Sequence, residues 1–146
     1  SAAFMAYAGI AYFQNQINLA AFSATLSGAI LAFLWFNIPP ARFWMTETGT
    51  MGLTMTLAVV AFMTDTLGSG YGVAALPIIA FPIVMTVLSN VVQVGSKKLR
   101  GKKVFRIAPL HHHFEAIGWP PYKVTMRYWV ISIVCAIIGI TIAITA

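Results

Sequence analysis

Three adjacent histidines are the residues of this sequence with the clearest potential for chemistry. The run "APLHHHFE" spans residues 108–115 and places His111, His112 and His113 beside Glu115. Imidazole rings titrate near neutral pH, and they can donate hydrogen bonds to anionic oxygens or carry a proton in acid–base catalysis. The run is therefore a candidate site. Its structural alternative is a polar loop whose rings bond to backbone carbonyls.

A zinc site made of these histidines alone is disfavoured. Adjacent residues of a helix point about 100° apart, and in an extended loop His112 faces away from His111 and His113. No cysteine or second histidine group accompanies the run. Binding of anionic oxygens is the chemistry that suits it better.

A second polar stretch, "FNIPPARFWMTETGT" at residues 36–50, contains Glu47 and three threonine hydroxyls around Gly49. A carboxylate, hydroxyls and cations on one membrane face suit a phosphate-bearing substrate with a divalent metal. Glu47 has a structural alternative, because an acid is also favoured at the positive end of a helix. Trp44 is either an interfacial aromatic or a surface that stacks on a flat ligand such as a nucleobase.

The elements that position these residues are predicted from composition. The 146 residues are 60% hydrophobic and 8% charged, whereas a soluble domain carries about 25% charged residues. We therefore expect an all-α polytopic membrane protein with about five transmembrane helices, one of them kinked at Pro77 and Pro82. The expected spans are residues 2–13, 19–36, 52–63 with their flanks, 71–94 and 128–146.

The charges orient these spans. The net charge is +6, and all nine basic residues are Arg42 or lie within residues 97–127, in the loops after the second and fourth spans. Residues 14–18 and 64–70 contain none. Because lysine and arginine accumulate on the cytoplasmic side, the histidine run is predicted to lie in a cytoplasmic loop. Basic residues bunched between apolar runs do not indicate a nucleic-acid partner.

Several motifs carry a resemblance to a known family. "FLWFN", "PAR", "TETGT", "VVQVGSKKLRGKKVFRIAPLHHHFEAIGWP" and "RYWVISI" together resemble the C-terminal half of the phospho-N-acetylmuramoyl-pentapeptide transferase (MraY) family, in the polyprenyl-phosphate hexosamine-1-phosphate transferase superfamily. The resemblance covers essentially the whole sequence. Residues 1–146 are thus expected to be the C-terminal part of a single integral-membrane transferase domain whose N-terminal half is missing.

The resemblance implies an activity. The full-length enzyme would transfer phospho-MurNAc-pentapeptide from UDP-MurNAc-pentapeptide to undecaprenyl phosphate with Mg²⁺ as cofactor. The products would be lipid I and UMP, in peptidoglycan synthesis for cell-wall biogenesis, cell shape and cell division. The expected location is the bacterial inner (plasma) membrane, with the active site on the cytoplasmic face of the lipid bilayer. The 146 residues alone are expected to be inactive, and a homodimer is compatible with the resemblance.

The resemblance also implies roles for single residues. Glu47 falls where the family has its metal-binding aspartate, and Trp44 where the family has a phenylalanine that stacks on uracil. The family's usual "GDTGS" is "TETGT" here, so that the acid is one methylene longer and Thr50 replaces a serine. The remaining implied positions are His111, His112 and His113 as catalytic residues, and Asn37, Gln93 and Ala108, with Thr50, in the substrate pocket.

Two alternatives remain open at this stage. One is a sister transferase that uses UDP-N-acetylglucosamine, which the histidine run disfavours. The other is a non-catalytic membrane scaffold or degenerate subunit, which the altered "TETGT" motif and the missing half make plausible.

Overall fold

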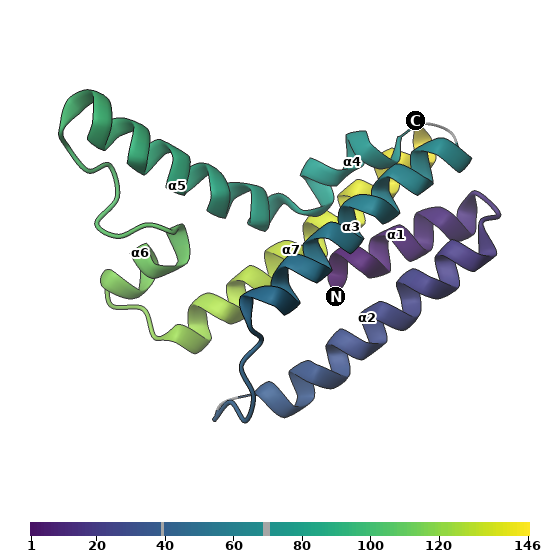
Figure 1. Cartoon of the computed structure of the whole chain (residues 1–146), viewed down its shortest axis with the longest axis horizontal. Coiled ribbons are helices and arrows are strands. Elements are labelled where there is room, and N and C mark those ends of the chain that lie inside the picture. The colour runs from purple at the N-terminus through teal and green to yellow at the C-terminus, as the bar shows by residue number, and fades with distance from the viewer. Residues whose placement is uncertain (39, 69–70) are drawn as a thin grey trace. The chain divides into compact units, whose positions relative to one another are not determined.

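Every regular element in the described part of the chain is an α-helix, which confirms the predicted all-α class. The computed structural model describes residues 1–38, 40–68 and 71–146 (Figure 1). These residues form two compact units, residues 1–79 with 136–146 and residues 80–135. The helices are α1 (Ala2–Phe13), α2 (Ile17–Asn37), α3 (Glu47–Leu67), α4 (Gly72–Ile79), α5 (Phe81–Arg100), α6 (Leu110–Ala116) and α7 (Pro121–Thr145).

Three of these helices, α2, α3 and α7, are long and apolar enough to cross a membrane, and the chain is a multi-pass membrane protein. A fourth span results if α4 and α5 are counted as one broken helix. The break at Ala80 lies between Pro77 and Pro82, in agreement with the predicted kink, because proline cannot donate the backbone hydrogen bond that continues a helix.

Four of the five predicted spans correspond to α2, α3, the broken pair α4 and α5, and α7, which are long and apolar enough to cross a membrane. The first predicted span is α1, which has 12 residues.

In the first unit, α1 lies at the centre of the core. Its residues are apolar on all sides, and the face with Phe4, Tyr7 and Ile10 is buried against α2, α3 and α4. The small residues Ser23 and Ser27 of α2 are fully buried, as expected for close helix packing. The core residues are Phe4, Ala6, Tyr7, Ile10, Ala11, Leu19, Ala20, Leu57, Val60, Ala61, Ala75, Ile79, Ala136 and Ala143.

Two side chains hold the start of α4. The Tyr7 hydroxyl donates to the carbonyl oxygen of Gly72 at 2.7 Å, and the Gly72 N–H donates to the Asp65 carboxylate at 2.6 Å. A Cβ atom at Gly72 would lie 2.7 Å from the carbonyl oxygen of Ala61, so this close approach to α3 requires glycine. Asp65 thus has a structural role at the end of α3.

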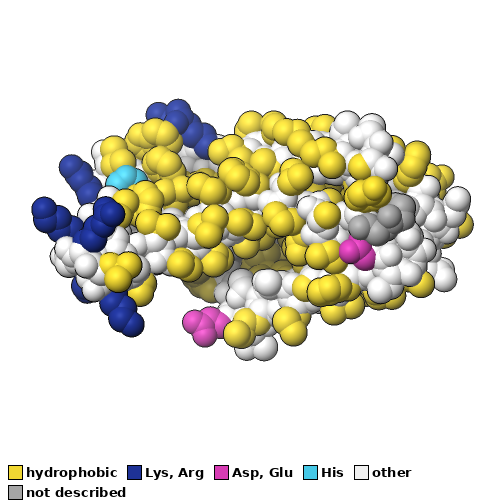
Figure 2. All heavy atoms as spheres, turned by 90° about the horizontal axis from the view of Figure 1, so that it is seen from above, with side chains coloured by type: hydrophobic (Ala, Val, Ile, Leu, Met, Phe, Trp, Pro, Cys, Tyr) yellow, Lys and Arg dark blue, Asp and Glu magenta, His cyan; other side chains and the backbone are white. Residues whose placement is uncertain are grey.

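The second unit consists of α5, α6 and the first part of α7. Helix α5 ends at Gly101, whose φ of 65° is the left-handed conformation that glycine adopts readily at helix ends. The end of α5 and the segment after it carry six exposed basic side chains: Lys97, Lys98, Arg100, Lys102, Lys103 and Arg106. In Figure 2, dark blue lysine and arginine side chains gather near a cyan histidine, while hydrophobic side chains dominate the rest of that face.

Candidate functional site

The three histidines lie on a short helix. His111, His112 and His113 occupy the first half of α6, a short helix within the loop that was predicted to carry them. The helix begins after Pro109, whose carbonyl oxygen accepts hydrogen bonds from the backbone N–H groups of His112 and His113. Proline is restricted to conformations that commonly precede a first helical turn, which favours a helix start here. The three rings therefore point in different directions around α6.

Hydrogen bonds set the tautomers of two of the rings. The backbone N–H of Arg106 donates to Nδ1 of His113 at 3.2 Å. Nδ1 is then an acceptor, so the neutral His113 ring carries its proton on Nε2. Nδ1 of His112 lies 3.1 Å from Oε2 of Glu115, and because a carboxylate only accepts, this Nδ1 carries a proton. Neutral His113 thus presents Nε2 as a donor, whereas neutral His112 presents Nε2 as an acceptor.

His111 is partly buried, as is His113, whereas His112 is exposed. This burial lowers the pKa of the His111 ring below its ordinary value, and the nearby His112 lowers the pKa further. Glu115 opposes both effects. His111 is therefore neutral at physiological pH, and its centroid lies 4.2 Å from that of His112.

Aromatic rings support the other end of α6. The rings of Phe114 and Trp119 are stacked with their centroids 5.1 Å apart, and the Arg127 guanidinium lies 4.0 Å from the Trp119 centroid. Such cation–π contacts contribute roughly 0.5–2 kcal/mol. The stack joins the end of α6 to the first turns of α7. Trp119 and Arg127 were not predicted as site residues, although Trp119 lies in the "GWP" sequence that follows the histidines.

Two further predicted residues lie in the same unit as the histidines. Gln93 of α5 bonds through its side-chain amide to the backbone of Val104 and Phe105. Ala108 is half-buried just before Pro109. The structure therefore brings Gln93, Ala108 and the histidine helix together, with Gln93 bonded to the protein itself.

The other predicted residues lie where α2 ends and α3 begins, in the first unit. Glu47 is the first residue of α3, is exposed and follows Thr46, whose side chain makes no capping hydrogen bond. The Thr50 hydroxyl donates to the carbonyl oxygen of Glu47 at 2.9 Å. Trp44 is 85% exposed, so that its ring is open to a stacking partner. The oxygen of the Asn37 side chain is buried and has no hydrogen-bond partner.

The predicted site residues form two groups, one in each compact unit. Among the described residues, no three histidine, cysteine, aspartate or glutamate side chains converge as a metal site. Mg²⁺ needs fewer protein ligands, since it is commonly bound by one or two carboxylates together with water and substrate phosphates. The exposed Glu47 carboxylate beside threonine hydroxyls fits one such ligand.

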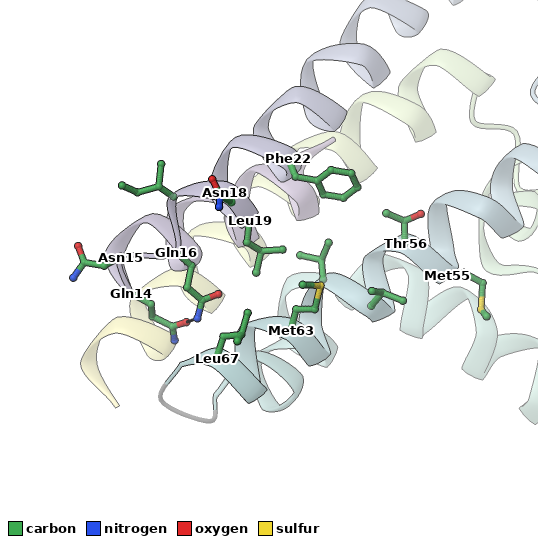
Figure 3. A pocket seen from close by; sticks show the side chains of 13 residues that line it. Gln14, Asn15, Gln16, Asn18, Leu19, Phe22, Met55, Thr56, Met63 and Leu67 are labelled. Atoms are coloured by element: carbon green, nitrogen blue, oxygen red, sulfur yellow. Dashed lines mark hydrogen bonds between the residues drawn. The ribbon is translucent and has the colours of Figure 1, made fainter.

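A wide cavity in the first unit is a different feature (Figure 3). It has a volume of about 1230 Å³ and is lined by the turn between α1 and α2 and by side chains of α2 and α3, such as Phe22 and Met63. At its rim, Nε2 of Gln16 donates to Oε1 of Gln14 at 3.2 Å. No predicted site residue and no charged side chain lines the cavity, so it offers no group for acid–base or metal chemistry.

Residues 1–65 match glycosyl transferase family 4. The chain is 43% identical over 135 residues to the phospho-N-acetylmuramoyl-pentapeptide-transferase of Leptospira biflexa, covering 92% of the chain and 35% of that protein.

Two more relatives bear the same name. The protein from Geobacillus thermodenitrificans is 39% identical over 140 residues, which are 96% of the chain and 41% of the relative. The protein from Shouchella clausii is 38% identical over 144 residues, which are 99% of the chain and 42% of the relative. The resemblance to this family is confirmed, and the chain spans about two-fifths of the length of these relatives.

Proposed function

We propose that the full-length protein transfers phospho-MurNAc-pentapeptide from UDP-MurNAc-pentapeptide to undecaprenyl phosphate, releasing UMP and forming lipid I. The observation that carries this proposal is the similarity to enzymes named for the phospho-N-acetylmuramoyl-pentapeptide transfer over 99% of the chain, which includes the histidine helix. A sister transferase and a scaffold lack such support.

The histidine helix is suited to hold the diphosphate of the donor. Neutral His113 carries its proton on Nε2 and can donate it, because its Nδ1 is already bonded to the backbone of Arg106. A donor fixed in this way can stabilise negative charge that develops on a phosphate oxygen without reorganising. His112, whose Nδ1–H points to Glu115, can accept a proton or a hydrogen bond on Nε2. The exposed cations before α6 add attraction for the anionic donor.

The start of α3 is suited to hold the metal and the nucleotide. Glu47 would ligate Mg²⁺, which would neutralise charge on the diphosphate during transfer. The Glu47 carboxylate is exposed, and the Thr50 hydroxyl is held at the same helix start by the Glu47 backbone carbonyl. Trp44 would stack on the uracil. The unpaired oxygen of Asn37 would accept a hydrogen bond from the nucleotide.

The setting of the reaction is the cytoplasmic face of the bacterial inner membrane. The support is the distribution of charge: the exposed cations of α5 and the segment after it mark a cytoplasmic side. The acceptor phosphate of a polyprenyl lipid lies at this same interface, so the lipid can attack the donor while its chain remains in the bilayer.

The test is a donor comparison with the purified full-length protein, undecaprenyl phosphate and Mg²⁺. We expect UMP release and lipid I formation with UDP-MurNAc-pentapeptide, and no product with UDP-GlcNAc. Alanine at one or more of His111, His112 and His113 should lower kcat/KM by about 100-fold, the scale for losing one preorganised donor. Product only from UDP-GlcNAc would establish the sister activity, and no product from either donor would favour a scaffold.

A further inference from the structure

Three polar side chains of α5 are bonded to the segment that carries the histidines. Ser89, Gln93 and Ser96 are four and three residues apart, so they lie on one face of the helix. Ser96 donates through Oγ to the carbonyl oxygen of Lys102 at 3.0 Å. The three residues thus contact successive parts of residues 102–110, in an otherwise largely apolar helix.

Gln93 holds the middle of this segment with three hydrogen bonds. Its Oε1 accepts from the N–H of Val104 at 3.1 Å and from the N–H of Phe105 at 2.9 Å. Its Nε2 donates to the carbonyl oxygen of Phe105 at 2.8 Å. The amide oxygen therefore has both of its lone pairs engaged by the backbone of the segment.

Ser89 holds the start of the histidine helix. Its Oγ accepts the backbone N–H of Leu110, the first residue of α6, at 3.1 Å and donates to the carbonyl oxygen of Thr86 at 2.7 Å. Ser89 is the buried residue of α5, at 5% exposure. Its hydroxyl is therefore fixed as donor and acceptor at once.

The histidine helix needs such support for two reasons. It has only seven residues, and helices shorter than about 12 residues are marginal on their own. The first N–H groups of any helix lack partners within the helix, and the residue before α6 is Pro109, whose side chain offers no capping oxygen. Ser89 supplies from a neighbouring helix the acceptor that Pro109 does not provide.

We propose that Ser89 is a positioning residue for the histidines: by binding the Leu110 N–H it fixes where α6 begins and thereby the direction of each imidazole ring. Gln93 and Ser96 fix the segment before it, which includes Arg106, the backbone partner of His113. The consequence for catalysis rests on the proposed function, whereas the fastening of α6 by Ser89 does not.

The experiment uses the full-length protein and two measurements. Hydrogen–deuterium exchange reports the order of α6 independently of activity, and steady-state kinetics with UDP-MurNAc-pentapeptide report kcat and KM. The variants are Ser89→Ala, which removes the hydroxyl, and Ser89→Thr, which retains it. Ser132→Ala is the matched control, because the Ser132 hydroxyl bonds only within its own helix, to the carbonyl oxygen of Tyr128.

We expect the amides of residues 110–113 to exchange about tenfold faster in Ser89→Ala, because a buried N–H loses its partner. Exchange in Ser89→Thr and Ser132→Ala should match the wild type. Gln93→Ala should instead speed exchange at residues 104–106. In Ser89→Ala, kcat and kcat/KM should fall together by about tenfold or more, as for an interaction needed in the transition state, and threonine should restore both.

Equal exchange in Ser89→Ala and Ser132→Ala would overturn the proposal. Faster exchange with wild-type kcat/KM would overturn it as well, since an unfastened helix would then turn over normally. If the alanine variant does not fold, Ser89→Thr and Ser89→Val provide the same comparison at equal side-chain shape. A wild-type protein without transferase activity would refute the proposed function, and the exchange data would still decide whether Ser89 fastens α6.

Discussion

His113 accepts the backbone N–H of Arg106 through Nδ1, across seven positions of the sequence. This bond joins the basic segment to the histidine helix, and it leaves Nε2–H as the donor of the ring.

Substitution of His113 can separate its two nitrogens. In His113→Gln the side-chain amide reaches about as far as Nε2 and can donate outward, whereas in His113→Asn the amide oxygen can replace only the Nδ1 acceptor. We expect Gln to retain kcat/KM within about tenfold and Asn to lose about 100-fold, the value of one preorganised donor. The reverse order in steady-state kinetics would show that the ring serves only to bind the backbone of Arg106.

Acidification should loosen α6 through His111. Because burial lowers the pKa of His111 in the folded state, the unfolded segment binds the proton first as the pH falls below about 6.5. The free energy that holds α6 folded with a neutral His111 is therefore constant above that pH and decreases below it. Amide exchange of residues 110–116 should accelerate between pH 7 and pH 5 more in the wild type than in His111→Gln. In Glu115→Gln, NMR titration should give a lower His111 pKa, because the carboxylate raises it.

Glu47 provides the test of the metal site. Glu47→Gln keeps the shape but removes the charge, so we expect almost no activity and a higher Mg²⁺ requirement. Glu47→Asp keeps the charge on a shorter arm and should be partly active, and Thr46→Gly should improve it. The wild type, Glu47→Gln, Glu47→Asp and the double variant with Thr46→Gly and Glu47→Asp are compared by Mg²⁺ titration of lipid I synthesis. If Glu47 acts only at the helix dipole, each change costs about 1 kcal/mol of stability or less and leaves the Mg²⁺ midpoint unchanged.

The orientation of the spans can be tested with single cysteines in a Cys135→Ser background. A cysteine in place of Ala116, which is exposed at the end of α6, should react with an impermeant thiol reagent only from the cytoplasmic side. A cysteine at Ser69, a position outside the described residues, should react only from the opposite side. Labelling in the opposite sense would place the histidine helix on the wrong face for a cytoplasmic donor.

The 146-residue chain alone should form no lipid I. Its described residues supply one exposed carboxylate at the α3 start and no convergent metal ligands. The measurement is product formation by the purified chain beside the full-length protein in the same detergent. Turnover by the chain would show that the metal and donor groups are complete within it.

The sequence predicted the helical membrane class and the helix break between Pro77 and Pro82, because hydropathy and proline chemistry act locally. The histidine helix was missed because its seven residues depend on Ser89, which is 21 residues away from Leu110. The repeat of Ser89, Gln93 and Ser96 on an apolar helix could have indicated this contact. The roles of Glu47, Trp44 and Asn37 are still predictions.

The bond from Tyr7 to the Gly72 carbonyl sets an order for biogenesis. The two residues are 65 positions apart, and at 5–20 residues per second a ribosome takes about 3–13 s to make the chain between them. During this delay α1 is synthesised and inserted without α4, and its hydroxyl lacks the acceptor that it has in the finished fold. A polar group without a partner in hydrocarbon is costly, so α1 remains near the interface or beside other helices until α4 emerges.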